Sequence, residues 1–264
     1  MLFAIPALAL CGLASASCGT PEPSDQGLAI HREFQAKAAT PVARQAADKE
    51  IEVYVHVIRN FPSEDTLEDG VREQMTILNQ VYGDTGFSFT LAGMHAPVFE
   101  NLPPIPIMDD SPIYQLRRGN VQTLNIYIAQ DLSGTAGVST WPWDYTNHPQ
   151  RDGIRVQRDY IPGGSKTGTE VRSGKSAAHE VGHWLGLLHT FQGGCEGDGD
   201  YIDDTPAEAS SVSGCPRARD TCPGKEGLDP ISNYMDYADD VCRTEFTPRQ
   251  IQRMHNIWAQ YRSR

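Results

Sequence analysis

The chain has 264 residues, of which 39% are apolar, 8% aromatic and 21% charged, a globular composition that excludes disordered, collagen-like and coiled-coil chains. Its net charge of −12 argues against nucleic acid or an anionic membrane surface as the main partner, because both would repel the chain at neutral pH. The longest apolar run, residues 1–16, is shorter than the roughly 20 residues that span a bilayer, so no transmembrane helix is expected.

The N-terminus has the pattern of an export signal. An apolar core over residues 2–13 is followed by Ala14, Ser15 and Ala16, the small residues that a signal peptidase requires. We therefore expect residues 1–17 to be a signal peptide and the protein to be secreted. Residues 18–48 are rich in Ala, Pro and polar residues without a sustained period, which predicts a pro-segment or a poorly ordered lead-in. The folded domain is expected over residues 49–264.

The predicted secondary structure mixes strands and helices. Alternating apolar residues predict strands over 51–57, 87–91 and 124–128, with shorter strands at 137–141 and 153–156. Apolar residues at helical spacing predict a helix over 67–82. A closing helix has Thr247 as N-cap, Pro248 at its first position and Gln250 completing a capping box, with Phe246 and Ile251 as a hydrophobic staple. Residues 193–242 are expected to be loops.

The most informative stretch runs from residue 179 to residue 189 and reads HEVGHWLGLLH. On a helix, His179 and His183 lie one turn apart on the same face, so both imidazoles can reach one metal ion. Gly186 can adopt a positive φ and turn the chain so that His189 returns as a third ligand. Neutral imidazoles suit zinc, so the stretch predicts a zinc site.

Three protein ligands leave one tetrahedral position open for water, which is typical of a catalytic rather than a structural zinc site. Zinc lowers the pKa of such a water from 15.7 to about 7, and the adjacent carboxylate of Glu180 can take its proton. The sequence therefore predicts Glu180 as the general base. Two other interpretations stay open: a helix whose histidines only pack, and a zinc site without catalysis.

The run NYMDY follows at residues 233–237. Together with the histidine motif it resembles the metzincin metalloproteases, with Met235 as the Met-turn beneath the zinc. The fuller run over 179–194 is similar to the pappalysin or cytophagalysin family, and in particular to its secreted fungal extracellular metalloproteases. This resemblance implies an α+β fold in which a twisted mixed sheet and the zinc helix lie above a cleft. Below the cleft it implies an irregular subdomain stapled by disulfides.

The resemblance also implies how substrate binds. A protein or peptide substrate would lie extended across the cleft and pair with an edge strand, for which residues 137–140 are the candidate. Tyr237 would hydrogen-bond the oxyanion of the tetrahedral intermediate. The alternative for Tyr237 is a core tyrosine with a satisfied hydroxyl.

Five cysteines remain once Cys11 leaves with the signal. Four of them fall in the loop region and allow three pairings that sequence alone does not separate. The family resemblance favours Cys195 with Cys222 and Cys215 with Cys242. The fifth, Cys18, lies in the predicted pro-segment, where its thiolate can occupy the open zinc position, as in the cysteine switch of metzincin zymogens. The alternative is an exposed N-terminal thiol.

Acidic residues are concentrated in the same loops, with 13 acids and 4 basic residues between residues 195 and 245. Carboxylates this close in sequence repel one another unless they are solvated or bind a cation. Calcium takes six to eight oxygen ligands from flexible loops, so the acids predict a calcium site, against the alternative of a solvated acidic face. The candidate ligands are Asp198, Asp200, Asp203 and Asp204, with Glu208 nearby.

These patterns together predict a secreted zinc endopeptidase with one catalytic zinc ion, made with a signal and a pro-segment. The alternative from another class is a secreted zinc-binding or adhesive module that uses the cleft without cleavage. An intact glutamate beside an open coordination position favours the enzyme.

Overall fold

The structure is a computed structural model that describes residues 18–37, 48–100, 102, 111–164 and 174–263. The predicted signal peptide and residues 38–47 of the predicted pro-segment lie outside the described residues. In the part of the chain that is described, no helix is long and apolar enough to cross a membrane.

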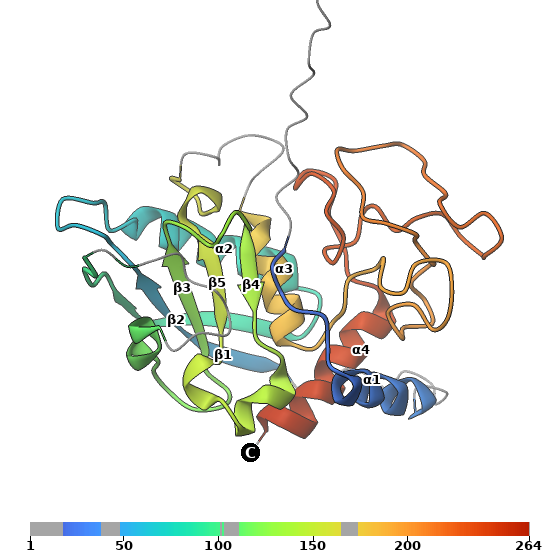
Figure 1. Cartoon of the computed structure of the whole chain (residues 1–264), viewed down its shortest axis with the longest axis horizontal. Coiled ribbons are helices and arrows are strands. Elements are labelled where there is room, and N and C mark those ends of the chain that lie inside the picture. Colours follow the sequence, from blue (N-terminus) through green and yellow to red (C-terminus); the bar gives the residue numbers. More distant parts are fainter. Residues whose placement is uncertain (1–17, 38–47, 101, 103–110, 165–173, 264) are drawn as a thin grey trace, which may run out of the picture.

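A mixed sheet of five strands forms one side of the described molecule, at the left in Figure 1. The strands are β1 (Lys49–Val57), β2 (Phe87–His95), β3 (Leu124–Ala129), β4 (Gly137–Ser139) and β5 (Ile154–Gln157). Their order is β2-β1-β3-β5-β4, and only β4 is antiparallel to its neighbour. The predicted mixed sheet is confirmed, and β4 lies at its edge.

Two helices cover one face of this sheet, α2 (Glu68–Tyr82) and α3 (Lys175–Trp184). Alternate residues of a strand point to the same face, so Val53 and Val55 of β1 pack in one core with Leu78 of α2 and Val181 of α3. A second apolar cluster includes Tyr127 of β3 and Ile113 of a short helix. The short helices are η1 (Pro112–Leu116), η2 (Pro142–Thr146), η3 (Pro149–Arg151), η4 (Arg158–Tyr160) and the π-helical η5 (Trp258–Arg262).

The predicted pro-segment contains a helix that the sequence pattern did not predict, α1 (Asp25–Lys37). Ser24 Oγ accepts a hydrogen bond from the Gly27 amide, and Asp25 lies in the first turn, both of which favour a helix start. Its buried residues, Gly27, His31 and Phe34, follow helical spacing. The expectation of a poorly ordered lead-in is therefore wrong for residues 25–37. The period was hidden because two of the three buried residues are a glycine and a histidine.

The region from residue 190 to the start of α4 (Pro248–Ile257), at the right in Figure 1, contains no helix and a single isolated β-bridge. Two disulfides cross it and join Cys195 to Cys222 and Cys215 to Cys242, the pairing that the family resemblance implied. The capping box predicted for Thr247 and Gln250 is present at the start of α4. This loop region has little core of its own, so the two disulfides and the capped start of α4 hold it in place.

A buried ion pair joins the end of α3 to the sheet edge. Arg262 and Asp152 are almost fully buried and form a salt bridge at 3.0 Å. Asp152 also accepts a hydrogen bond from the indole nitrogen of Trp184, the last residue of α3, and from the hydroxyl of Thr140, just past β4. The Arg262 guanidinium covers the Trp184 ring at 3.5 Å from its centroid. Asp152 therefore fixes β4 relative to α3.

Replacing Arg262 by Met should lower the free energy of unfolding by about 3 kcal/mol, because Asp152 would keep a buried charge with Arg117 as its remaining cationic partner, at 3.5 Å. Denaturant unfolding of Arg262→Met and of the double variant Arg262→Met/Asp152→Asn measures this. The double variant should recover part of the loss. If the free energy of unfolding of Arg262→Met falls by less than about 1 kcal/mol, the buried ion pair is weaker than we expect.

Candidate metal centre

Helix α3 has defined ends. At its start, Asp240 Oδ2 accepts a hydrogen bond from the Lys175 amide at 2.9 Å, which satisfies one of the free N–H groups of the first turn. At its end, Gly186 has φ +89°, the Leu187 amide donates to Gly182 O and the Gly186 amide donates to His183 O. This is a Schellman ending with glycine in the left-handed position. The positive φ predicted for Gly186 is observed, and it reverses the chain towards His189.

Three histidine side chains converge above this turn. The Nε2 atom of His183 lies 3.2 Å from that of His179 and 3.1 Å from that of His189. With Cys18 Sγ they form a group whose ligand atoms all lie within 4.8 Å of one another. His179 and His183 come from α3, as their spacing predicts, and His189 arrives through the turn.

Backbone carbonyls orient two of these rings. Tyr234 O lies 2.8 Å from His179 Nδ1, and Leu187 O lies 2.7 Å from His183 Nδ1. A carbonyl can only accept, so each Nδ1 carries the proton and each Nε2 is free to bind a metal. Burial lowers the pKa of all three histidines, that of His183 to about 4, so the imidazoles are neutral near pH 7. The donor set therefore fits zinc.

Glu180 lies next to this group and is almost fully buried. Its Oε2 accepts a hydrogen bond from the Thr20 hydroxyl at 2.9 Å and from the Cys18 thiol at 3.4 Å. Burial raises the pKa of Glu180 to about 7. The carboxylate thus faces residues 18–20 on the side where Cys18 approaches the histidines.

Gly137 of β4 leaves the space that Glu180 occupies. A Cβ on Gly137 would lie 2.6 Å from Glu180 Cγ and 2.7 Å from its Oε1. No side chain fits there without moving the carboxylate.

Met235 lies beneath α3, and Tyr237 lies beside His189. Met235 is fully buried beneath α3, and a Cβ on Gly182 would overlap its sulfur, so the glycine makes room for the methionine. The Tyr237 hydroxyl lies 3.0 Å from His189 Nε2. Tyr237 therefore borders the metal centre and not the apolar core.

Residues 18–20, the start of the predicted pro-segment, run along the edge strand β4. Cys18 forms a parallel bridge with Gly137, and the Gly19 amide donates to Gly137 O at 2.8 Å. One residue on, Thr20 Oγ1 accepts from the Ser139 amide at 2.8 Å. The free edge of β4 is therefore covered by residues 18–20, while the same threonine hydroxyl contacts Glu180.

The four aspartates predicted to bind calcium do not gather into one site. Among the described residues, the group of three or more His, Cys, Asp or Glu side chains close enough to share an ion is the one with Cys18 and the three histidines. Asp204 instead accepts hydrogen bonds from the Thr247 hydroxyl and the Arg249 amide at the start of α4. Asp203 accepts from Gln35, and Glu208 forms an ion pair with Arg219. The calcium prediction for these side chains is therefore not supported.

Comparison with known proteins decides the family. A peptidase family described as "Pregnancy-associated plasma protein-A" matches residues 108–259. An extracellular metalloprotease of Pyricularia oryzae is 42% identical over 276 residues, covering 99% of this chain and 96% of the relative. This chain belongs to the pappalysin family of metalloproteases.

Solved structures agree with this assignment. Mirolysin in complex with compound 9 has a TM-score of 0.72 and 25% identity, over 83% of this chain and 94% of that one. Mature mirolysin of Tannerella forsythia in complex with a cleaved peptide has a TM-score of 0.68 and 25% identity, over 81% and 93%. The predicted metzincin-like α+β fold and the metalloprotease assignment are confirmed, and zinc is the metal that the family implies.

Three residues near the metal centre of this pappalysin were not singled out from the sequence. Thr20 contacts Glu180, Gly137 makes room for Glu180, and Asp240 caps α3. The sequence pattern indicates Gly137 only as part of the candidate edge strand. Each contact joins residues more than 40 positions apart, so no local pattern reveals it.

Replacing Gly137 by Ala should displace Glu180 while leaving the histidines in place. The expected result is a fall of roughly 100-fold in kcat/KM, the scale of a 1 Å misplacement of a reacting group, with zinc content unchanged. Peptidase assay and metal analysis of the enzyme freed of its pro-segment measure both. Gly224→Ala, where an added Cβ meets nothing, is the matched control. Equal activity of the two variants would refute this role for Gly137.

Proposed function

We propose that this pappalysin is a secreted zinc endopeptidase made as an inactive precursor. Residues 1–17 would be the export signal, residues 18–48 the pro-segment and residues 49–264 the catalytic domain. Its substrates are proteins or peptides. The observation that carries the proposal is the convergence of three neutral imidazoles beside a buried glutamate at the edge of a sheet. The fungal relatives named as extracellular metalloproteases support secretion.

The chain's own residues have distinct tasks in this mechanism. His179, His183 and His189 would hold one zinc ion, which when bound polarises the scissile carbonyl and acidifies the attacking water. Glu180 takes a proton from that water and returns it to the leaving amine. The carboxylate lies on the metal side of the helix, because it accepts a hydrogen bond from the Cys18 thiol, which lies among the histidine nitrogens.

Two further groups would act on the substrate. Tyr237, whose hydroxyl lies beside His189 Nε2, donates a hydrogen bond to the oxyanion that develops as water attacks. The edge of β4 offers backbone groups to an extended substrate. The bridge between Cys18 and Gly137 supports this role, because another extended segment already pairs with that edge.

Glu180→Gln should retain one zinc per chain and lose hydrolysis by about 10²–10⁴-fold, because an amide cannot take up the water proton. The measurement is chelator-sensitive cleavage of casein with metal analysis of the same sample. Glu196→Gln, at an exposed glutamate, is the control. A zinc-loaded Glu180→Gln variant with near-normal turnover would contradict the assignment of Glu180 as the general base. Stoichiometric zinc in an inactive wild-type enzyme would favour the rival zinc-binding module.

We further propose that the pro-segment inhibits the enzyme by contacting both parts of the site. Cys18 Sγ lies among the histidine nitrogens, where its thiolate would take the coordination position that water needs. The Thr20 hydroxyl donates to Glu180, so the general base is engaged as well. Residues 18–20 also cover the β4 edge, which excludes substrate.

Cys18→Ala in the uncut chain should raise casein cleavage about tenfold or more, since each 1.4 kcal/mol of lost binding is a factor of ten. Mass spectrometry of the assayed sample verifies that residues 18–37 are still attached to the domain. Gln26→Ala, at an exposed position of α1, is the control. Activity that stays as low as that of the wild-type precursor would contradict inhibition through the thiol.

A further inference from the structure

The pro-segment has a second contact with the catalytic domain, well separated in sequence from Cys18. Helix α1 lies beside α4 and the loop that begins at Tyr201, at the lower end of the molecule (Figure 1). Its buried residues, Gly27, His31 and Phe34, face this surface. Neither α1 nor its neighbours here contribute to the proposed metal site.

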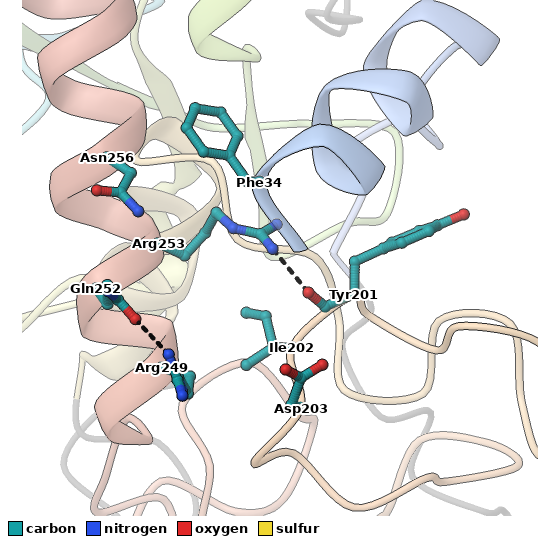
Figure 2. A pocket seen from close by; sticks show the side chains of 8 residues that line it. All are labelled: Phe34, Tyr201, Ile202, Asp203, Arg249, Gln252, Arg253 and Asn256. Carbon is teal, nitrogen blue, oxygen red and sulfur yellow. Dashed lines mark hydrogen bonds between the residues drawn. The ribbon is translucent and has the colours of Figure 1, made fainter. Parts of the chain in front are cut away.

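Figure 2 shows the outer part of this contact, a pocket formed by Phe34 of α1, the loop at Tyr201 and one side of α4. Phe34 is 7% exposed, and the Arg253 guanidinium lies 5.7 Å from the centre of its ring. Arg253 is held in turn by a 2.7 Å hydrogen bond from its Nη2 to Tyr201 O. At the rim, Gln35 donates to Asp203. The helix therefore has an apolar anchor with polar contacts around it.

His31 is the most deeply buried side chain of α1, with no exposed surface. Its Nδ1 accepts a 2.6 Å hydrogen bond from Arg253 Nη1, and its Nε2 has no hydrogen-bond partner among the described residues. The ring stacks on Tyr201 and meets Trp143 edge-on. Gly27 lets the helix approach Trp143 closely, since a Cβ there would lie 3.1 Å from the indole. We call Trp143, Tyr201 and Arg253 the α1 site.

We propose that the α1 site holds the pro-segment as a separate chain: after a cut between Lys37 and Lys49, residues 18–37 stay docked, and protonation of His31 releases them. This rests on the proposed precursor function. A cut alone would then leave the metal centre covered, because α1 keeps Cys18 and Thr20 close to their contacts. Activation would need an acidic medium in addition to the cut.

The neighbours of His31 make its protonation unfavourable in the docked state. Protonated Nδ1 can no longer accept from Arg253, and the imidazolium would face the guanidinium cation. From the loop, Asp200 and Asp203 interact with Arg253, and burial raises the pKa of Asp200 to about 8. The third neighbour, η2, presents the neutral ring of Trp143.

The sign of the pH effect follows from these contacts. Burial lowers the pKa of docked His31 to about 3, whereas a released segment would titrate near its ordinary value of about 6.5. Docking is thus at full strength above pH 6.5 and weakens by about tenfold per unit as the pH falls towards 3. Between pH 7.5 and pH 4.5 this amounts to roughly 100-fold.

The test uses the full chain with a specific protease site inserted between Lys37 and Lys49. After the cut, size-exclusion chromatography with mass spectrometry measures how much of residues 18–37 stays with the domain. The fragment should co-elute at pH 7.5 and separate at pH 4.5. Phe34→Ala should release it at both values, and Glu33→Ala, on the exposed face of α1, should behave as wild type.

His31→Gln separates this effect from acid loss of the metal. The glutamine keeps an acceptor for Arg253 but takes up no proton, so the fragment should stay bound at pH 4.5. If this variant does not dock at pH 7.5, His31→Asn, which places its oxygen near the Nδ1 position, replaces it. If the fragment is released at pH 4.5 from either variant to the same extent as from the wild-type chain, the role of His31 is overturned.

Two further outcomes distinguish this inference from the proposed function. A fragment lost at pH 7.5 from the wild-type chain would overturn docking, while chelator-sensitive cleavage by the freed domain would still support the zinc peptidase. A fragment retained at pH 7.5 together with full peptidase activity would leave the docking site intact. That result would instead refute inhibition by Cys18 and Thr20.

Discussion

The left-handed turn at Gly186 is the constraint on which the metal centre depends. It ends α3 at Trp184, one residue after His183, and returns the chain, so that His189 meets the two histidines of the helix. Any residue with a side chain would be strained by the positive φ at this position, and its Cβ would also clash with Ile257 of α4. The turn therefore couples the zinc helix to the closing helix. The carbonyl of Leu187, released by the same turn, orients His183.

The groups proposed for hydrolysis also contact residues 18–20 of the proposed pro-segment. Glu180 accepts from Thr20 and Cys18, and β4 pairs with the segment by backbone hydrogen bonds. The proposed inhibition needs no second active-site conformation, since the segment would bind these residues in the positions that the reaction requires. The contacts of α1 would add affinity away from the histidines, where they would not compete with the chemistry.

Sequence reasoning succeeded where one short segment contains the whole signal. The alternation over β1, the spacing of His179 and His183, and the capping box at Thr247 are local, and each is observed. It failed where distant residues meet, as with the Asp240 cap of α3 or the space beside Gly137. The calcium prediction assumed that acids close in sequence converge. Asp204, for one, turns instead to the start of α4.

The most direct test compares the full chain with the domain over residues 49–264, measuring zinc content and casein cleavage on the same samples. The account predicts one zinc per chain in both proteins, and cleavage, abolished by a chelator, by the shorter protein alone. Full zinc occupancy without cleavage by the shorter protein, or equal cleavage by both, would contradict it.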